Sequence, residues 1–195
     1  MDKFMDNDLQ TRGSELLRVA RDAILSAYGQ SLKTDSSHPS LQVKAASFVT
    51  LQESNKLRGC IGTIDPHRSL LLDVRGNAID AAFNDPRFEP VSLNEIDRIT
   101  IEVSVLTPRV PINYESSFDL YSQIKPGVDG VYIEYGQHRG TFLPQVWQQL
   151  PDKEQFFKHL KSKAGLPPDF WSENLKVYRY RVQKWSEAEQ TGAHS

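Results

Sequence analysis

Apolar residues recur every three or four positions in two N-terminal stretches, which is the spacing of a helix with one buried face. The first stretch follows Ser14 and ends near Gly29, and the second follows Ser69 and ends at Ala81. Each serine is the expected N-cap, because its hydroxyl can accept a free backbone N–H of the first turn. The same spacing predicts a third helix over residues 152–164.

Apolar and polar residues alternate in other stretches, which predicts strands with one buried face. These strands cover residues 47–51, 57–64 and 99–105. Polar residues 52–56 join the first two strands, so we expect a hairpin there. Residues 30–43 have neither spacing and are expected to form a loop.

The second half of the chain follows the same plan as the first. Strand, turn, strand and helix are predicted in this order over residues 131–150, as they are over residues 47–82. An Arg-Gly pair recurs as well, because Arg58-Gly59 corresponds to Arg139-Gly140. The pattern therefore predicts an α+β fold with two related strand-hairpin-plus-helix units.

The only cysteine of the chain, Cys60, lies between Gly59 and Gly62 in a predicted strand. Glycine inside a strand often marks a bulge or a close approach by a ligand or another backbone. In an extended strand Arg58 and Cys60 share a face, where the guanidinium can favour a thiolate. Two interpretations stay open: a small buried thiol that fills a gap, and a reactive residue.

Two further stretches carry polar residues that suit a site. Asn84-Asp85-Pro86-Arg87 predicts a turn, because proline fixes its own φ and aspartate can accept a backbone N–H beyond it. Arg87 is then held on a stiff turn. Glu102 lies on the polar face of the strand over 99–105, where a glutamate is usually only solvated.

Five ordered motifs resemble the AMMECR-one domain family, and the resemblance extends over residues 10–187. The motifs are residues 57–63, 81–88, 101–107, 141–147 and 163–166. The resemblance implies that the two related units share one mostly antiparallel, barrel-like sheet flanked by helices. We expect a single domain over residues 9–185, between a flexible N-terminus over 1–8 and a flexible, polar tail over 186–195.

The resemblance also implies partners. Prokaryotic members of the family resemble protein A of the AmmeMemoRadiSam set, whose gene is accompanied by genes for a Memo-type protein and a radical SAM protein. A Memo-type protein and a radical SAM protein are therefore the expected protein partners.

Composition excludes several classes of function. The net charge of −2 argues against a general nucleic-acid binder, and the alternating arginines and aromatics over 176–185 are typical of a half-buried strand. No stretch has about 18 uninterrupted apolar residues, so no membrane-spanning helix is expected. Residues 1–8 lack the apolar segment of a signal peptide, which favours a cytoplasmic protein. The histidines form no close pair and Cys-x-x-Cys is absent, so we expect no metal site and no cofactor.

Two function hypotheses follow. In the first, the domain is an accessory that binds a small anionic ligand or a modified polypeptide segment, because arginines offer planar donors to carboxylate or phosphate and glycines admit the ligand to the backbone. The ligand-binding candidates are Arg58, Gly59, Gly62, Asp85, Arg87 and Arg139. In the second, Cys60 is a nucleophile activated by Arg58 and a nearby acid or base, with Glu102 and His138 as candidates.

Overall fold

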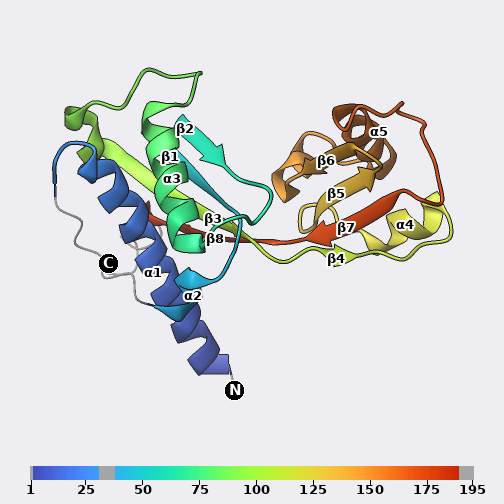
Figure 1. Ribbon diagram of the computed structural model, residues 1–195, viewed down its shortest axis with the longest axis horizontal. Coiled ribbons are helices and arrows are strands. Elements are labelled where there is room, and N and C mark those ends of the chain that lie inside the picture. The colour runs from blue at the N-terminus through green and yellow to red at the C-terminus, as the bar shows by residue number, and fades with distance from the viewer. Residues whose placement is uncertain (1, 31–37, 189–195) are drawn as a thin grey trace. The chain divides into compact units, whose positions relative to one another are not determined.

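The computed structural model describes residues 2–30 and 38–188, and these form two units with separate cores. The first unit extends to Val105 and resumes at Gln183, whereas the second is the continuous segment Leu106–Val182 (Figure 1). The second unit is therefore inserted into the first.

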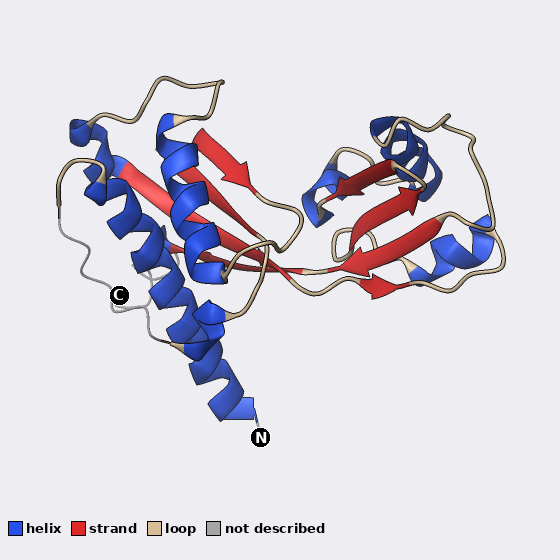
Figure 2. Cartoon of the chain, in the orientation of Figure 1, coloured by secondary structure: helices blue, strands red, loops and turns tan. Residues whose placement is uncertain are grey.

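The first unit is an open antiparallel sheet with helices on its apolar face. The strand order is β2-β1-β3-β8, and the strands are β1 Ser47–Glu53, β2 Lys56–Gly62, β3 Ile99–Leu106 and β8 Val182–Ser186. The main helices are α1 Asp2–Ser26 and α3 Leu70–Phe83. Alternation places Val49, Leu51, Ile101 and Val103 on one face, where all four are fully buried with the apolar stripes of the two helices. Helices α1 and α3 cover this face of the sheet (Figure 2). Ser69 is the N-cap of α3, as its position in the sequence predicts.

Helix α1 is longer than the apolar spacing predicts. It begins at Asp2, so Ser14 lies inside the helix and is not its cap. Among residues 11–26 of α1, the buried apolar side chains begin at Leu16 and continue to Ile24. Apolar spacing indicates the buried face of a helix but does not fix where the helix begins, so a serine before the spacing need not be its cap.

Two short helices complete the first unit. Helix α2 covers Pro39–Gln42, inside the stretch expected to be a loop, and the His38 side chain caps it. The rest of that stretch, residues 31–37, lies outside the described residues. The 3-10 helix η1 covers Leu93–Arg98 and begins with a capping box, in which Glu95 accepts the backbone N–H of Ser92.

The second unit has a sheet of the same size. Its order is β4-β7-β5-β6, and the strands are β4 Val110–Pro111, β5 Gly130–Tyr135, β6 His138–Phe142 and β7 Lys176–Tyr180. The helices are α4 Ser117–Gln123, η2 Pro144–Gln148 and α5 Lys153–Lys163. Trp147 stacks on Phe156 at 3.6 Å in the core. Asp152 caps α5, and Gly165, with φ +78°, follows its C-cap, Ala164.

The two sheets have equivalent strand orders. Read from the hairpin edge, β2-β1-β3-β8 corresponds to β6-β5-β7-β4. The equivalent glycines have equivalent contacts, because a Cβ on Gly59 would meet the carbonyl oxygen of Ala81 in α3 and a Cβ on Gly140 would meet that of Leu160 in α5. The repeated Arg-Gly pair thus marks the place where each hairpin packs on its helix.

The expectation of one shared barrel-like sheet is wrong. The strands form two separate four-stranded sheets, and neither closes. Each sheet buries its apolar face against helices of its own unit, so closure is not needed to form a core. Sequence alternation reports which face of a strand is buried, and it contains no information about whether strands from the two repeats pair.

Candidate functional site

The sheet of the first unit brings three polar side chains into one row. Thr50 on β1 lies opposite Cys60 on β2 and opposite Glu102 on β3, and directly opposed residues share a face. The Thr50 hydroxyl donates a hydrogen bond to Cys60 Sγ over 3.3 Å. The thiol is partly exposed and is the only one in the chain.

Asp85 is the anchor of the Cys60 backbone. Its Oδ2 accepts the N–H of Cys60 at 2.9 Å, across 25 residues of sequence. Its Oδ1 and Oδ2 also accept from Arg87 Nε and Nη2 at 2.9 and 2.7 Å, which is a bidentate pair. The side chain is only 2% exposed. The Arg87 guanidinium and the backbone N–H of Cys60 hold the pKa of Asp85 well below its usual range, although burial acts in the opposite direction.

Arg87 connects this anchor to the surface. Its Nη2 donates to the Cys60 carbonyl oxygen at 3.1 Å, and its guanidinium lies 5.5 Å from the centre of the Phe88 ring. The Asp85 carboxylate, and to a smaller extent Cys60, raise the pKa of Arg87. The side chain is nevertheless 54% exposed. Its Nη1 donates to none of the described residues, so this part of the guanidinium is open to a ligand.

Arg58 does not have the role that strand alternation predicts. The pairing of β1 with β2 shifts between Leu51 and Gln52, which lie opposite Gly59 and Leu57, so Arg58 is the extra residue of a β-bulge. Its Nε donates to Glu95 at 3.0 Å instead. Ser92 and Arg58 lower the pKa of Glu95 to about 2. The guanidinium that bonds to Cys60 is therefore that of Arg87.

The two glycines beside Cys60 lie against the protein's own chain. A Cβ on Gly59 would be 2.1 Å from the Ala81 carbonyl oxygen, and a Cβ on Gly62 would be 2.2 Å from the Phe48 ring. Internal packing therefore accounts for the space that each glycine leaves.

The other predicted residues lie on other strands. Glu102 shares its face, but with Thr50 between them, and its carboxylate pairs with Lys184 at 2.8 Å. Arg139 and His138 lie on β6 of the second unit, where His138 Nδ1 lies 3.1 Å from the Ala164 carbonyl oxygen. The structure thus joins Cys60, Asp85 and Arg87 directly. Arg58 is linked to them through Phe88, with its guanidinium 6.0 Å from that ring.

Asp73 is an important residue that the sequence reasoning missed. It is fully buried in α3, and its carboxylate accepts hydrogen bonds from Ser47, Thr63, Arg68 and Asn77. These bonds attach the start of β1 and the residue after β2 to α3, the helix that ends two residues before Asp85. A signal was present, because Asp73 and Asn77 are spaced by four residues beside the apolar stripe of α3.

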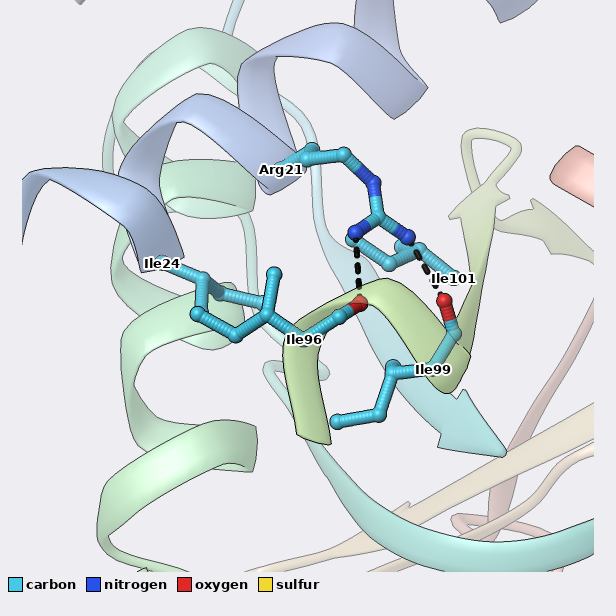
Figure 3. Close-up of a pocket in the computed structure, with 5 residues that line it drawn as sticks. All are labelled: Arg21, Ile24, Ile96, Ile99 and Ile101. Carbon is cyan, nitrogen blue, oxygen red and sulfur yellow. Dashed lines mark hydrogen bonds between the residues drawn. The ribbon is translucent and has the colours of Figure 1, made fainter. Parts of the chain in front are cut away.

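A pocket between α1 and η1 is filled by its own side chains. Arg21 donates to the Ile96 and Ile99 carbonyl oxygens at 3.0 and 2.7 Å, with Ile24 and Ile101 beside it (Figure 3). Its Nε and Nη2 also bind Glu187, whose Oε2 accepts the backbone N–H of Ile101 at 2.8 Å. Glu187 raises the pKa of Arg21. The space left would not hold a water molecule, so this is a structural clamp.

The described residues contain neither a cluster of metal ligands nor a membrane-spanning helix. No group of three or more His, Cys, Asp or Glu side chains within residues 2–30 and 38–188 is placed to hold a metal ion. None of the helices in the same ranges has the length and apolarity needed to cross a bilayer.

The fold and motifs are those of a known family. The chain belongs to the AMMECR1 family, whose model matches residues 17–185, and the resemblance seen in the five motifs is thereby confirmed. Protein MJ0810 of Methanocaldococcus jannaschii is 41% identical over 186 residues, which cover 92% of each chain. A protein of Methanothermobacter thermautotrophicus is 41% identical over 180 residues, which cover 90% of this chain and 94% of its own.

A solved structure shows the same fold. The crystal structure of the uncharacterized protein PH0010 from Pyrococcus horikoshii superimposes with a TM-score of 0.74 at 39% identity, and covers 90% of this chain and 91% of that one. A bacterial relative from Thermotoga maritima is 37% identical over 162 residues, which cover 81% of this chain and 88% of its own. The family therefore includes archaeal and bacterial proteins.

Proposed function

We propose that the Arg87 surface, defined as Arg87 with Asp85, Cys60 and Phe88, binds the anionic group of a small molecule or of a modified polypeptide segment. The observation that carries the proposal is the state of the Arg87 guanidinium. It is fixed by a bidentate pair with a buried carboxylate and by the Cys60 carbonyl oxygen, yet half of its side chain is exposed. A guanidinium held in place gives up little side-chain entropy when it binds a carboxylate or phosphate.

Asp85 has a positioning role in this proposal. Its low pKa keeps it ionised at neutral pH, and both oxygens are used by donors of the protein. It therefore holds Arg87 and the Cys60 peptide group in place and does not carry protons. A ligand bound at Arg87 Nη1 lies next to the partly exposed Cys60 thiol. The size and shape of the ligand are therefore limited by the space beside Cys60.

The nucleophile hypothesis has less support. The Cys60 thiol receives a hydrogen bond from Thr50, and both candidate bases have contacts of their own: Glu102 pairs with Lys184, and His138 Nδ1 lies 3.1 Å from the Ala164 carbonyl oxygen. A nucleophilic cysteine needs an adjacent base or a thiolate-stabilising cation, and only Arg87 meets that description here.

Alkylation of Cys60 by two related reagents tests the anion site. Iodoacetate carries a negative charge and iodoacetamide does not, and both form an S–C bond with the thiolate and release iodide. Because both rates depend equally on the thiolate fraction, their ratio reports only the attraction of the anion. We expect Arg87→Ala to lower this ratio roughly fivefold, which corresponds to about 1 kcal/mol between unit charges near 4 Å in water.

Arg98→Ala is the matched control, because Arg98 is an exposed arginine of the same unit and pairs with Glu53. Arg87→Lys keeps the charge and should keep most of the ratio. Circular dichroism verifies that each variant is folded. An unchanged ratio in folded Arg87→Ala would show that Arg87 attracts no anion at Cys60, and the proposal would be abandoned.

The partner proposal is supported by the family resemblance alone. In this proposal, the protein is a cytoplasmic accessory to a Memo-type protein and a radical SAM protein. The Arg87 surface binds the substrate on which these partners act. Co-purification and activity of the reconstituted set test this, with wild-type protein compared against Arg87→Ala and Cys60→Ala. If the set works equally well without this protein, the accessory role is wrong.

A further inference from the structure

A pocket of about 300 Å³ lies in the second unit, where the loop before β5 meets the C-terminal end of β7. Its polar lining consists of Thr107, Lys125, Asp129, Arg179, Tyr180 and Arg181. All of these residues belong to the second unit, so this pocket is distinct from the Arg87 surface. Its volume is at the lower end of the range of small-molecule sites.

One wall of the pocket is a stiff turn. Asp129 is 1% exposed, and its Oδ2 accepts the backbone N–H of Lys125 at 2.9 Å, while its own N–H donates to the Lys125 carbonyl oxygen. Gly127, with φ +77°, allows the chain to turn between them. Trp147 Nε1 fixes the turn from the core by donating to the Asp129 carbonyl oxygen. The Lys125 backbone is therefore held in place before any ligand binds.

The charges of the lining do not balance. Arg181 Nε lies 3.8 Å from Asp129 Oδ1, which leaves Lys125 and Arg179 without a carboxylate partner among the described residues. Arg179 Nη1 donates to the Gln123 carbonyl oxygen, so its guanidinium is oriented while its other nitrogens stay available. The pocket thus has two unneutralised positive charges, one of them a planar fork of donors.

We propose that this pocket binds the phosphate group of a small phosphomonoester. Such a group carries a charge of about −1.5 to −2 at pH 7, which matches the two unpaired cations. Arg179 supplies paired N–H donors to the phosphate oxygens and Lys125 a point charge. The proposal does not depend on the Arg87 surface, because it uses other residues in the other unit.

Isothermal titration calorimetry with glycerol 3-phosphate tests the site on the full chain at low salt. Inorganic phosphate is a second probe, which shows whether the phosphate group alone is enough, and glycerol is the uncharged control. We expect Lys125→Gln and Arg179→Gln each to weaken binding about tenfold, as the loss of one charge-assisted hydrogen bond predicts. Lys176→Gln removes an exposed charge from the same strand and should leave the affinity unchanged.

A substitution that is expected to raise the affinity for phosphate complements the two that lower it. Asp129→Asn keeps an acceptor for the Lys125 N–H but removes the competing negative charge, so phosphate should bind more tightly. The affinity should also fall with added salt. The proposal is wrong if the wild-type protein does not bind either phosphate probe at millimolar concentrations, or if Lys125→Gln and Arg179→Gln, folded by circular dichroism, both bind as the wild type does.

Discussion

Gly59 lies against the carbonyl oxygen of Ala81, so that a Cβ on residue 59 would be 2.1 Å from it. The obstacle is helix backbone, which cannot rotate away. We therefore expect Gly59→Ala to lower the free energy of unfolding by about 1–3 kcal/mol, the usual cost of overpacking. Gly62→Ala should cost less, because its obstacle is the movable Phe48 ring. Urea denaturation of both variants measures the difference, and equal stability of Gly59→Ala and wild type would contradict the packing argument.

Asp85 should make the stability depend on pH. Its pKa is lower in the folded state than the value of about 3.9 in an unfolded chain, so its contribution is complete above pH 4 and is lost as the pH falls further. Asn does not titrate, so the stability difference between wild type and Asp85→Asn should be largest near pH 7 and shrink below pH 4. Denaturation curves between pH 3 and pH 7 check this. A difference that stays constant over that range would show that Asp85 has no such role.

Glu187 should stabilise the first unit although it lies close to the C-terminus. Glu187→Gln weakens two charge-assisted bonds to Arg21 and one to the Ile101 N–H, and we expect a loss of about 1–3 kcal/mol. Glu53→Gln is the control, because Glu53 pairs with Arg98 at the exposed surface and should matter less. Thermal melts of the two variants should separate clearly. Identical melts would mean that the Arg21 clamp contributes nothing.

Asp73 should be the most sensitive carboxylate of the first unit. Asp73→Ala removes the buried acceptor shared by Ser47, Thr63 and Arg68 and one of the acceptors of Asn77, so a loss of about 3–5 kcal/mol is expected. Asp80→Ala, on the same helix, removes only an exposed hydrogen bond from Asn84 and should cost much less. Yield and urea denaturation measure both. Similar stabilities would disprove the importance of the buried network.

Local patterns predicted much of the fold. The Asn84-Asp85-Pro86-Arg87 turn is present, with the Phe88 N–H bonded to the Asp85 carbonyl oxygen and the Arg87 N–H to its carboxylate. The hairpins, the Ser69 cap and the helix after Asp152 are also where the spacing places them. Helix α4 was missed because its one buried residue, Leu120, produces no periodic stripe.

The candidate site was harder to predict, because its geometry depends on contacts between distant segments. The sequence identified Cys60, Asp85 and Arg87 individually, but nothing local shows that Asp85 reaches the Cys60 N–H from 25 residues away. Alternation placed Arg58 beside Cys60, and a single bulge removed it. Glu187 was not identified, because a flexible polar tail was expected from residue 186. Its side chain is held by a hydrogen bond from Arg21, which is 166 residues away in the sequence. Residues 189–195 lie outside the described residues.

The inserted arrangement of the two units determines the order in which their cores can form during synthesis. Leu106–Val182 is continuous, so the later-encoded core can assemble as soon as its own segment has left the ribosome. The earlier-encoded core has to wait for β8, the edge strand beside β3, and for Glu187. Until then β3 has an unpaired edge, which is a site where aggregation can begin. The segment that carries β8 and Glu187 thus determines when the exposed edge of β3 is covered.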